Sequence, residues 1–164
     1  MNSGKRQPSS RIPDPPDDSP RRFVDDYLGY LLAHASHLVT RQFHAQLRPR
    51  GIPVPVWRVL ANLWDADGLP VTELARYTFF KQPTLTKVID RMSRQGLVER
   101  RPSQRDRRKV LVYITPKGRT AVADLLVRAK QHERDVLAGY SHQEVERLKA
   151  ALHTLIQRCG GKRR

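Results

Sequence analysis

One segment decides the fold of this chain: Gln82-Pro83-Thr84-Leu85-Thr86-Lys87-Val88-Ile89-Asp90-Arg91-Met92-Ser93-Arg94. Pro83 suits the first turn of a helix, where its missing N–H costs nothing. Four apolar residues then recur at helical spacing and predict a buried stripe: Leu85, Val88, Ile89 and Met92. The opposite face carries Thr84, Lys87, Arg91 and Arg94. Because the stripe alone can hold the helix to a core, we expect the polar face to meet a partner and Gly96 to end the helix.

A shorter helix is predicted directly upstream, over residues 71–78. Thr72 is placed to act as its N-cap, and Glu73 in the first turn is favoured by the helix dipole. Residues 79–81 leave room only for a tight turn, so the two helices form a helix-turn-helix. The second helix of such a pair can enter the DNA major groove with its N-terminal residues against base edges.

Two β-rich runs follow the second helix, residues 97–101 and 109–115. A polar loop rich in arginine joins them, over residues 102–108. The pattern predicts a hairpin with a basic tip, which is the wing of a winged helix-turn-helix. The predicted fold is mainly α with a small β-hairpin wing.

At these residues the chain resembles the multiple-antibiotic-resistance regulator (MarR) family of bacterial transcription factors. The family's wing signature is Asp-x-Arg, then Val-x-Leu-Thr and a Gly; here it spans residues 106–118, with Ile114 in place of the Leu. Further matches lie in register before it: Trp57-Arg58-Val59-Leu60, Leu74-Ala75, Arg91-Met92 and Gly96-Leu97-Val98. The resemblance covers roughly residues 22–158. It implies a homodimer built from the first and the last two helices, with winged domains projecting from it.

The charge of the chain is consistent with a polyanionic partner. The 164 residues include 31 Lys and Arg against 16 Asp and Glu, a formal net charge of +15. Residues 70–118 alone hold 12 cationic and 4 acidic residues, a net +8. A solvated basic surface would also show such an excess, so the helix and wing carry the nucleic-acid interpretation.

Other features place the protein in the cytoplasm. Cys159 is the only cysteine, which excludes an intramolecular disulfide and a cysteine-based metal cluster. No apolar run approaches the ~20 residues of a membrane span, and the N-terminus lacks an apolar signal-peptide core. We therefore expect no membrane partner.

The segments outside the winged domain have distinct compositions. Residues 1–20 are rich in proline and polar residues and are predicted to be a disordered tail. Apolar residues at helical spacing predict one helix over about 22–47, a second from about Pro55, and a long helix over 116–139. Ser141 and Glu144 form a capping box that opens a final helix. The predicted division is a winged domain at 51–115 between dimerisation helices at 21–50 and 116–160.

Base-edge contacts in the major groove are assigned to residues at the start of the recognition helix: Gln82, Pro83, Thr84, Thr86 and Lys87. Gln can pair with adenine, Lys can reach guanine acceptors, and Thr and Pro carbons can meet a thymine methyl. DNA-backbone contacts are assigned to Thr72, Arg76, Lys81, Arg91 and Arg94. Double-stranded DNA is thus the expected partner.

At the wing, Arg105, Arg107 and Arg108 lie where a hairpin tip would reach a minor groove, whose narrow A/T tracts attract guanidinium groups. In the family, the Asp of the signature pairs with an Arg to brace the wing, and the Arg two residues later enters the groove. The resemblance transfers these roles to Asp106 and Arg108. Arg107 is an alternative for the groove, and one of these arginines could instead pair with Asp106 or Glu99.

The resemblance also implies control by a small effector, often an aromatic or phenolic anion, bound between the dimer helices and the winged domain. The residues expected to line this site are Tyr30, His34, His37, Trp57 and Arg58, which suit an aromatic carboxylate or an acyl-CoA thioester. Core packing is the competing role for Trp57 and Trp64. Cys159 does not match the family's peroxide-sensing branch, whose reactive cysteine lies in the first helix.

Three histidines, His34, His37 and His44, lie near one helix face, but without a cysteine or acid between them we expect ordinary helix histidines and no metal. The sequence shows no Gly-rich phosphate loop, Cys/His nucleophile pair or paired carboxylates, so we expect neither an enzyme nor a bound cofactor. The prediction is a ligand-responsive repressor that binds a pseudo-palindromic operator. The alternative is an architectural protein that binds nucleic acid without sequence preference.

Overall fold

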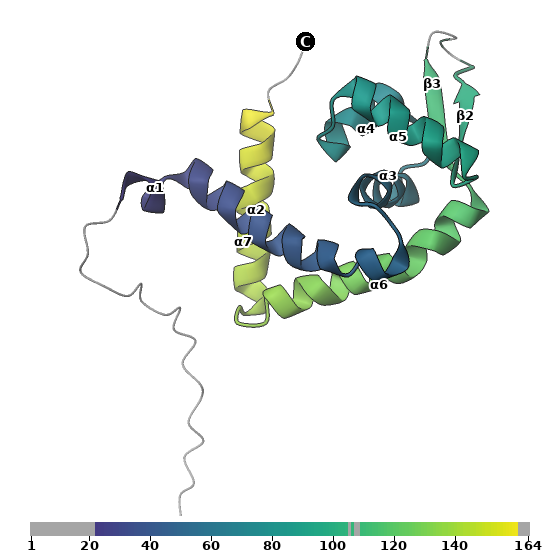
Figure 1. Cartoon of the computed structure of the whole chain (residues 1–164). Coiled ribbons are helices and arrows are strands. Elements are labelled where there is room, and N and C mark those ends of the chain that lie inside the picture. Colours follow the sequence, from purple (N-terminus) through teal and green to yellow (C-terminus); the bar gives the residue numbers. More distant parts are fainter. Residues whose placement is uncertain (1–21, 105, 107–108, 161–164) are drawn as a thin grey trace, which may run out of the picture. The chain divides into compact units, whose positions relative to one another are not determined.

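The structure is a computed structural model that describes residues 22–104, 106 and 109–160. The elements in this part of the chain are α1 Phe23–Asp26, α2 Leu28–Ala45, the 3-10 helix η1 Arg48–Arg50, α3 Val54–Asp65, β1 Leu69–Pro70, α4 Val71–Thr78, α5 Gln82–Arg94, β2 Val98–Pro102, β3 Val110–Ile114, α6 Pro116–Val136 and α7 His142–Cys159 (Figure 1). The chain is mainly helical with a small antiparallel sheet, which confirms the predicted fold class. None of these helices is apolar over the length that a bilayer crossing requires.

The chain divides into two compact units. Residues 34–132 form one, called here the central unit, and residues 1–33 with 133–164 form the other, the terminal unit. The predicted disordered tail, residues 1–20, lies outside the described residues. The predicted division at residues 51 and 116 assigns functional roles rather than compact units, and it stays a prediction.

Helix α3 provides the centre of the hydrophobic core of the central unit. Its apolar stripe is buried throughout: Val56, Val59, Leu60 and Leu63. The helix contacts α4, α5 and β3, so both helices of the helix-turn-helix and one strand of the wing rest on it (Figure 1). Burial of four such side chains stabilises this arrangement by roughly 1.5–3 kcal/mol each.

The wing belongs to a three-stranded antiparallel sheet with the order β1-β3-β2. Strands β2 and β3 pair from Val98 opposite Ile114 to Pro102 opposite Val110. The third strand, β1, was not predicted, because two residues carry no alternating pattern. Its pairing with Val112 and Leu111 brings the start of α4 to the base of the wing.

The predicted N-cap of α4 is wrong. The helix begins at Val71, and its N-cap is Pro70, which provides no side-chain cap. Pro70 is also the last residue of β1, so the chain passes directly from strand to helix. Thr72 is therefore already the second residue of the helix.

The single helix predicted over residues 22–47 is interrupted at Tyr27. The backbone of Tyr27 is extended, with φ −77° and ψ 114°, and separates α1 from α2. The Tyr27 ring stacks on Phe23 with 5.3 Å between ring centroids. A Cβ at Gly29 would lie 2.9 Å from the Tyr27 ring, so the absence of a side chain there makes room for the turn. The apolar spacing predicted the helix but not this local interruption.

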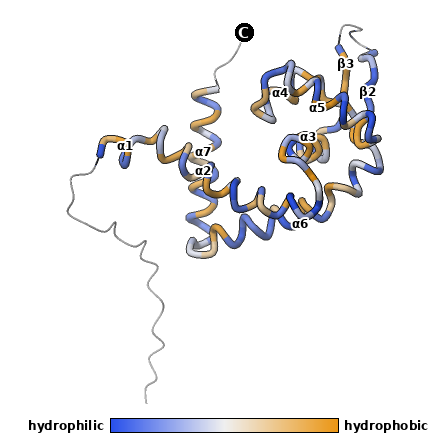
Figure 2. Tube along the Cα trace, in the orientation of Figure 1, coloured by the Kyte–Doolittle hydropathy of each residue, from blue (hydrophilic) through white to orange (hydrophobic). Residues whose placement is uncertain are grey.

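The terminal unit contains the predicted capping box at the start of α7. The Ser141 amide donates to Glu144 Oε2 at 2.7 Å, and the Glu144 amide donates to Ser141 Oγ at 3.3 Å. Hydrogen bonds from the Ser141 side chain and backbone lower the pKa of the Glu144 carboxyl. Apolar and polar bands alternate along α7 (Figure 2), yet none of its residues is buried, and Ile156 is 65% exposed.

Gly118, the glycine of the wing signature, lies where the start of α6 packs against the end of α5 and the start of β2. Thr115 Oγ1 donates to the Gly96 carbonyl at 2.7 Å and accepts from the Gly118 amide at 3.0 Å. A Cβ at Gly118 would lie 2.2 Å from the Leu97 carbonyl oxygen. Only glycine therefore allows this approach of helix to strand.

The substitution Gly118→Ala should lower the free energy of unfolding by about 1–3 kcal/mol, because the added methyl group forces the backbone apart. Urea denaturation followed by circular dichroism measures this. Gly139→Ala is the matched control, since a Cβ there meets nothing within 4 Å, and it should change the stability by less than about 0.5 kcal/mol. A Gly118→Ala variant as stable as the wild type would contradict the close packing.

Candidate nucleic-acid interface

Helix α5 is held by its apolar stripe and leaves its polar face outward. Leu85, Ile89 and Met92 are buried, and Val88 is half-buried against the core. The predicted outward residues are all exposed: Thr84, Lys87, Arg91 and Arg94. This burial pattern matches the prediction, and it orients three cationic side chains away from the core.

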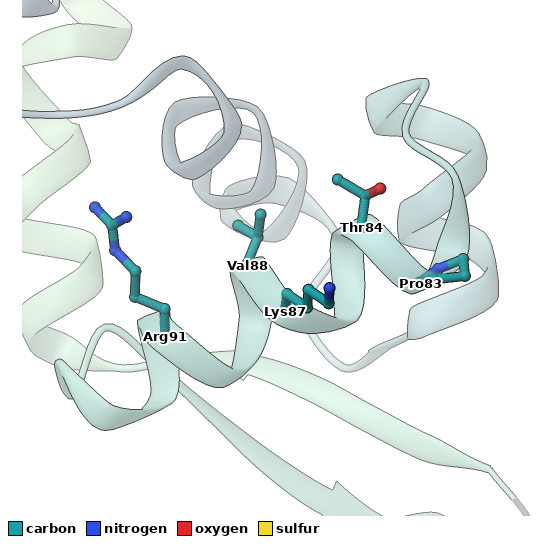
Figure 3. A pocket seen from close by; sticks show the side chains of 5 residues that line it. All are labelled: Pro83, Thr84, Lys87, Val88 and Arg91. Atoms are coloured by element: carbon teal, nitrogen blue, oxygen red, sulfur yellow. The ribbon is translucent and has the colours of Figure 1, made fainter.

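The exposed part of α5 has two sides. On one side, Gln82, Thr86 and Asp90 form a row four residues apart. Asp90 forms an ion pair with Arg100 of β2, so this row faces the wing. On the other side, Pro83, Thr84, Lys87, Val88 and Arg91 line a hollow of about 480 Å³. In Figure 3, Thr84, Val88 and Arg91 project from the same side of the helix.

The residues assigned to base contact differ in how freely they can meet a partner. Pro83, Thr84 and Lys87 are exposed. Thr86 is half-buried, and its hydroxyl donates to the Gln82 carbonyl at 2.9 Å. Thr86 therefore offers a partner its methyl group and a hydroxyl lone pair, while its proton stays within the helix.

The turn between α4 and α5 fixes the start of the recognition helix. Phe79 adopts the left-handed conformation with φ 58°, and the Phe80 amide donates to the Ala75 carbonyl at 3.2 Å. Arg58 donates to the Thr78 carbonyl at 3.2 Å and lies over the Phe80 ring at 5.6 Å. Arg58, which was predicted to line the effector site, thus links α3 to the turn of the helix-turn-helix.

The residues assigned to the DNA backbone are all exposed. Thr72 lies in the first turn of α4, and Lys81 is the N-cap residue of α5. The Arg76 guanidinium lies 4.8 Å from the centre of the Tyr77 ring and donates to its hydroxyl at 2.9 Å. Arg91 and Arg94 follow in the last turn of α5. The assignment of these residues to phosphates stays a prediction.

The wing tip is only partly described. Arg105, Arg107 and Arg108 lie outside the described residues, so their assignment to the minor groove stays a prediction. The Asp106 amide donates to Ser103 Oγ at 3.3 Å, and the Lys109 amide donates to the Asp106 carbonyl at 2.9 Å. Glu99 pairs with Arg101, which also lies over the Tyr113 ring at 4.8 Å.

Hydrogen bonds to the Asp67 carboxylate, called here the Asp67 latch, hold the wing strand β3 to the segment that follows α3. Sequence reasoning missed them. Asp67 Oδ1 accepts from the Ile114 amide at 2.8 Å and from the Gly68 amide at 3.1 Å. Asp67 Oδ2 accepts from Arg119 at 3.2 Å, and the Arg119 guanidinium lies 5.5 Å from the Trp64 ring. From sequence, Asp67-Gly68 indicated only the end of a helix, because partners 47 and 52 residues away leave no local pattern.

The residues predicted to bind the effector are divided between the units. Tyr30 belongs to the terminal unit, and His34, His37, Trp57 and Arg58 belong to the central unit. Trp57 packs at 5.0 Å from the Phe43 ring and takes part in the hydrophobic core. Burial, and then the charge of Arg58, lower the pKa of His44. Among the described residues, no three His, Cys, Asp or Glu side chains gather into a metal-binding group.

Comparison with known proteins gives consistent matches. The model of the MarR family matches residues 50–109. The organic hydroperoxide resistance transcriptional regulator of Bacillus subtilis is 30% identical over 136 residues, covering 82% of this chain and 90% of the relative. The transcriptional activatory protein BadR of Rhodopseudomonas palustris is 31% identical, covering 79% of this chain and 75% of the relative. A crystal structure of a MarR family regulator from Silicibacter pomeroyi matches this chain with a TM-score of 0.74 at 38% identity. The match covers 83% of this chain and 97% of that chain.

Replacing Asp67 by Ala should lower the free energy of unfolding by about 1–3 kcal/mol, because the Ile114 amide loses its acceptor near the core. Denaturant unfolding measures the loss, and faster hydrogen exchange at the Ile114 amide locates it. Asp65→Ala is the matched control, since Asp65 is exposed at the end of α3, and it should change stability by less than about 0.5 kcal/mol. Equal stabilities of the two variants would contradict the latch.

Proposed function

Because this chain belongs to the MarR family of DNA-binding transcriptional regulators, we propose that it binds a specific operator through α5 and the wing and represses the gene beside it. Members of this family are not enzymes. The observation that carries the proposal is the orientation of α5, whose apolar stripe is buried while Pro83, Thr84 and Lys87 are exposed at its N-terminal half. A helix presented in this way fits a major groove.

Each of these exposed residues offers a chemistry that suits base edges. The Lys87 ammonium can donate to the N7 and O6 acceptors of guanine, and Thr84 and Pro83 carbons can contact a thymine methyl. Gln82 is the remaining exposed candidate and suits adenine. The arginines of the wing tip, Arg107 and Arg108, would enter the adjacent minor groove, where shape rather than sequence is read.

We also propose that the protein acts as a homodimer, which is the typical state in this family. The terminal unit supports this with exposed apolar side chains on several helices: Phe23, Leu28, Leu31, Leu148 and Ile156. Large apolar surfaces exposed in a single chain mark interaction sites. A two-fold dimer presents two recognition helices, so its operator would contain two half-sites about one helical turn, ~10 base pairs, apart.

The test is a fluorescence anisotropy titration on a duplex from the region upstream of the protein's own gene, competed with a scrambled duplex at near-physiological salt. The upstream duplex should bind at least ~10³-fold more tightly. A duplex with a single half-site should bind far more weakly than the complete site. Equal competition by upstream and scrambled duplexes would favour the architectural alternative.

The variant Lys87→Gln sharpens this test. It should reduce the preference for the operator by about 1–3 kcal/mol, because a base contact is lost. Lys130→Gln is the control: it removes the same charge from an exposed position on α6 and should leave the preference unchanged. A preference that survives Lys87→Gln would remove this lysine from base recognition.

We propose further that an aromatic carboxylate or an acyl-CoA thioester releases the protein from DNA. The types of residue on two helices support this proposal. Trp57 on α3 and His34 and His37 on α2 combine aromatic rings with hydrogen-bond donors. Arg58 joins α3 to the turn before α5, so a ligand that moves Arg58 would also shift the recognition helix. Release requires only that the ligand prefer a state that fits DNA poorly.

A panel of aromatic acids and acyl-CoA thioesters should contain at least one member that binds by isothermal titration and releases the operator. Binding should also quench tryptophan fluorescence. That quenching should be lost in Trp57→Phe and kept in Trp64→Phe, because Trp64 packs on Arg119 instead. A panel that gives neither heat nor release would reject this effector class.

A further inference from the structure

A pocket lies between the recognition helix and the base of the wing. It has a volume of about 210 Å³ and is lined by Pro70, Val71, Thr72, Gln82, Thr86, Arg100, Lys109 and Val110. These residues come from the end of β1, the start of α4, the first turns of α5, the middle of β2, and the start of β3 with the residue before it. Sequence reasoning did not assign Arg100 or Lys109 to any site, because nothing local connects them to α5.

The lining is suited to an anion. Arg100 and Lys109 contribute cations, and Thr72 and Gln82 contribute a hydroxyl and an amide that can donate. Asp90 holds Arg100 in an ion pair that joins α5 to β2. Lys109 Nζ lies 3.9 Å from Asp106 Oδ2, too far for a hydrogen bond, so this contact occupies none of the ammonium donors.

The backbone of the two helices adds to this character. Both α4 and α5 begin at the pocket, with Val71 and Gln82 as their first residues, and neither N-cap residue provides a side-chain cap. The amides of an uncapped first turn carry partial positive charge and are available to an acceptor. Cationic side chains and backbone dipoles thus favour the same kind of ligand.

The position of the pocket identifies the ligand, on the premise of the proposed function. A protein that places α5 in a major groove and the wing in the adjacent minor groove must straddle the sugar-phosphate strand that separates the two grooves. Gln82 and Thr86 form the α5 side of that space, and Arg100 and Lys109 form the wing side. We propose that this pocket holds a phosphate of the straddled DNA strand, with Lys109 as its principal charge contact.

Two consequences follow for the neighbouring residues. Gln82, considered above for adenine, instead contacts the DNA backbone from within the pocket, where Thr86 presents its methyl group. Base reading then falls to Pro83, Thr84 and Lys87. The ion pair between Asp90 and Arg100 is a positioning contact, because it fixes the distance between the helix and the strand on either side of the bound phosphate.

Salt dependence tests the charge contact. Each phosphate contact adds about 0.9 to the slope of log affinity against log salt concentration. Lys109→Gln should therefore reduce the slope by about 1 and weaken operator and scrambled duplexes by the same factor. The Lys109 side chain is 61% exposed, so the substitution should leave the fold intact. Lys130→Gln, with the same loss of charge on α6, should leave the slope unchanged.

A scan with methylphosphonates locates the phosphate. Neutralising one phosphate at a time in the operator should weaken the wild type most at a position between the major-groove and minor-groove contacts of one half-site. The Lys109→Gln variant should lose its sensitivity at that position alone. Thr72→Val, which removes a hydroxyl from the opposite wall of the pocket, should weaken binding to the unmodified duplex and show the same selective loss.

The outcomes separate this inference from the function on which it rests. An unchanged salt slope in Lys109→Gln, or an undiminished response to every methylphosphonate, would overturn the phosphate pocket even if the operator is bound specifically. A reduced slope together with equal binding to upstream and scrambled duplexes would support the pocket and reject the sequence-specific regulator. A change in operator preference caused by Lys109→Gln would show base reading and overturn the backbone role.

Discussion

The interface depends on the burial of one apolar stripe on α5. Leu85, Ile89 and Met92 are inaccessible to solvent and pack in the same core as α3 and β2. With these three positions fixed, the angular spacing of a helix determines where every other residue of α5 points. That packing leaves Lys87 and Arg91 exposed. It also directs Gln82 and Thr86 toward the wing. Loss of the stripe would leave the polar face without a defined direction.

The wing is tied to this core by contacts of a different kind. A glycine without a side chain allows α6 to approach the Leu97 carbonyl, an aspartate accepts the Ile114 amide, and an ion pair joins Asp90 to Arg100. These polar and steric contacts have strict geometry, whereas apolar packing tolerates small shifts. Together they set the separation between the recognition helix and the hairpin to a fixed value. A DNA reader that engages two adjacent grooves requires such a fixed separation.

The terminal unit differs from the central unit in that it exposes its apolar side chains. Ser141 and Glu144 cap the start of α7, yet α7 contains no buried residue and exposes Leu148 and Ile156. A helix with an apolar stripe that its own chain leaves exposed gains most of its stabilisation when a partner covers that stripe. In the proposed homodimer, folding of this unit and association of the two chains are expected to be coupled, which would link the concentration of the protein to its capacity to bind DNA.

The sequence by itself determined the elements and the face of each helix. Apolar spacing identified α3 and α5, β-rich composition identified both wing strands, and the Ser141 and Glu144 pair identified the start of α7, because each of these signals lies within a few residues. The tertiary structure alone decided the pairing of β1, the true start of α4, the break at Tyr27, the Asp67 latch, and the pocket between α5 and the wing. These features join residues that are distant in sequence or depend on the space around one ring. Local patterns set which side chains are available, and only the packing of the whole chain decides which of them meet.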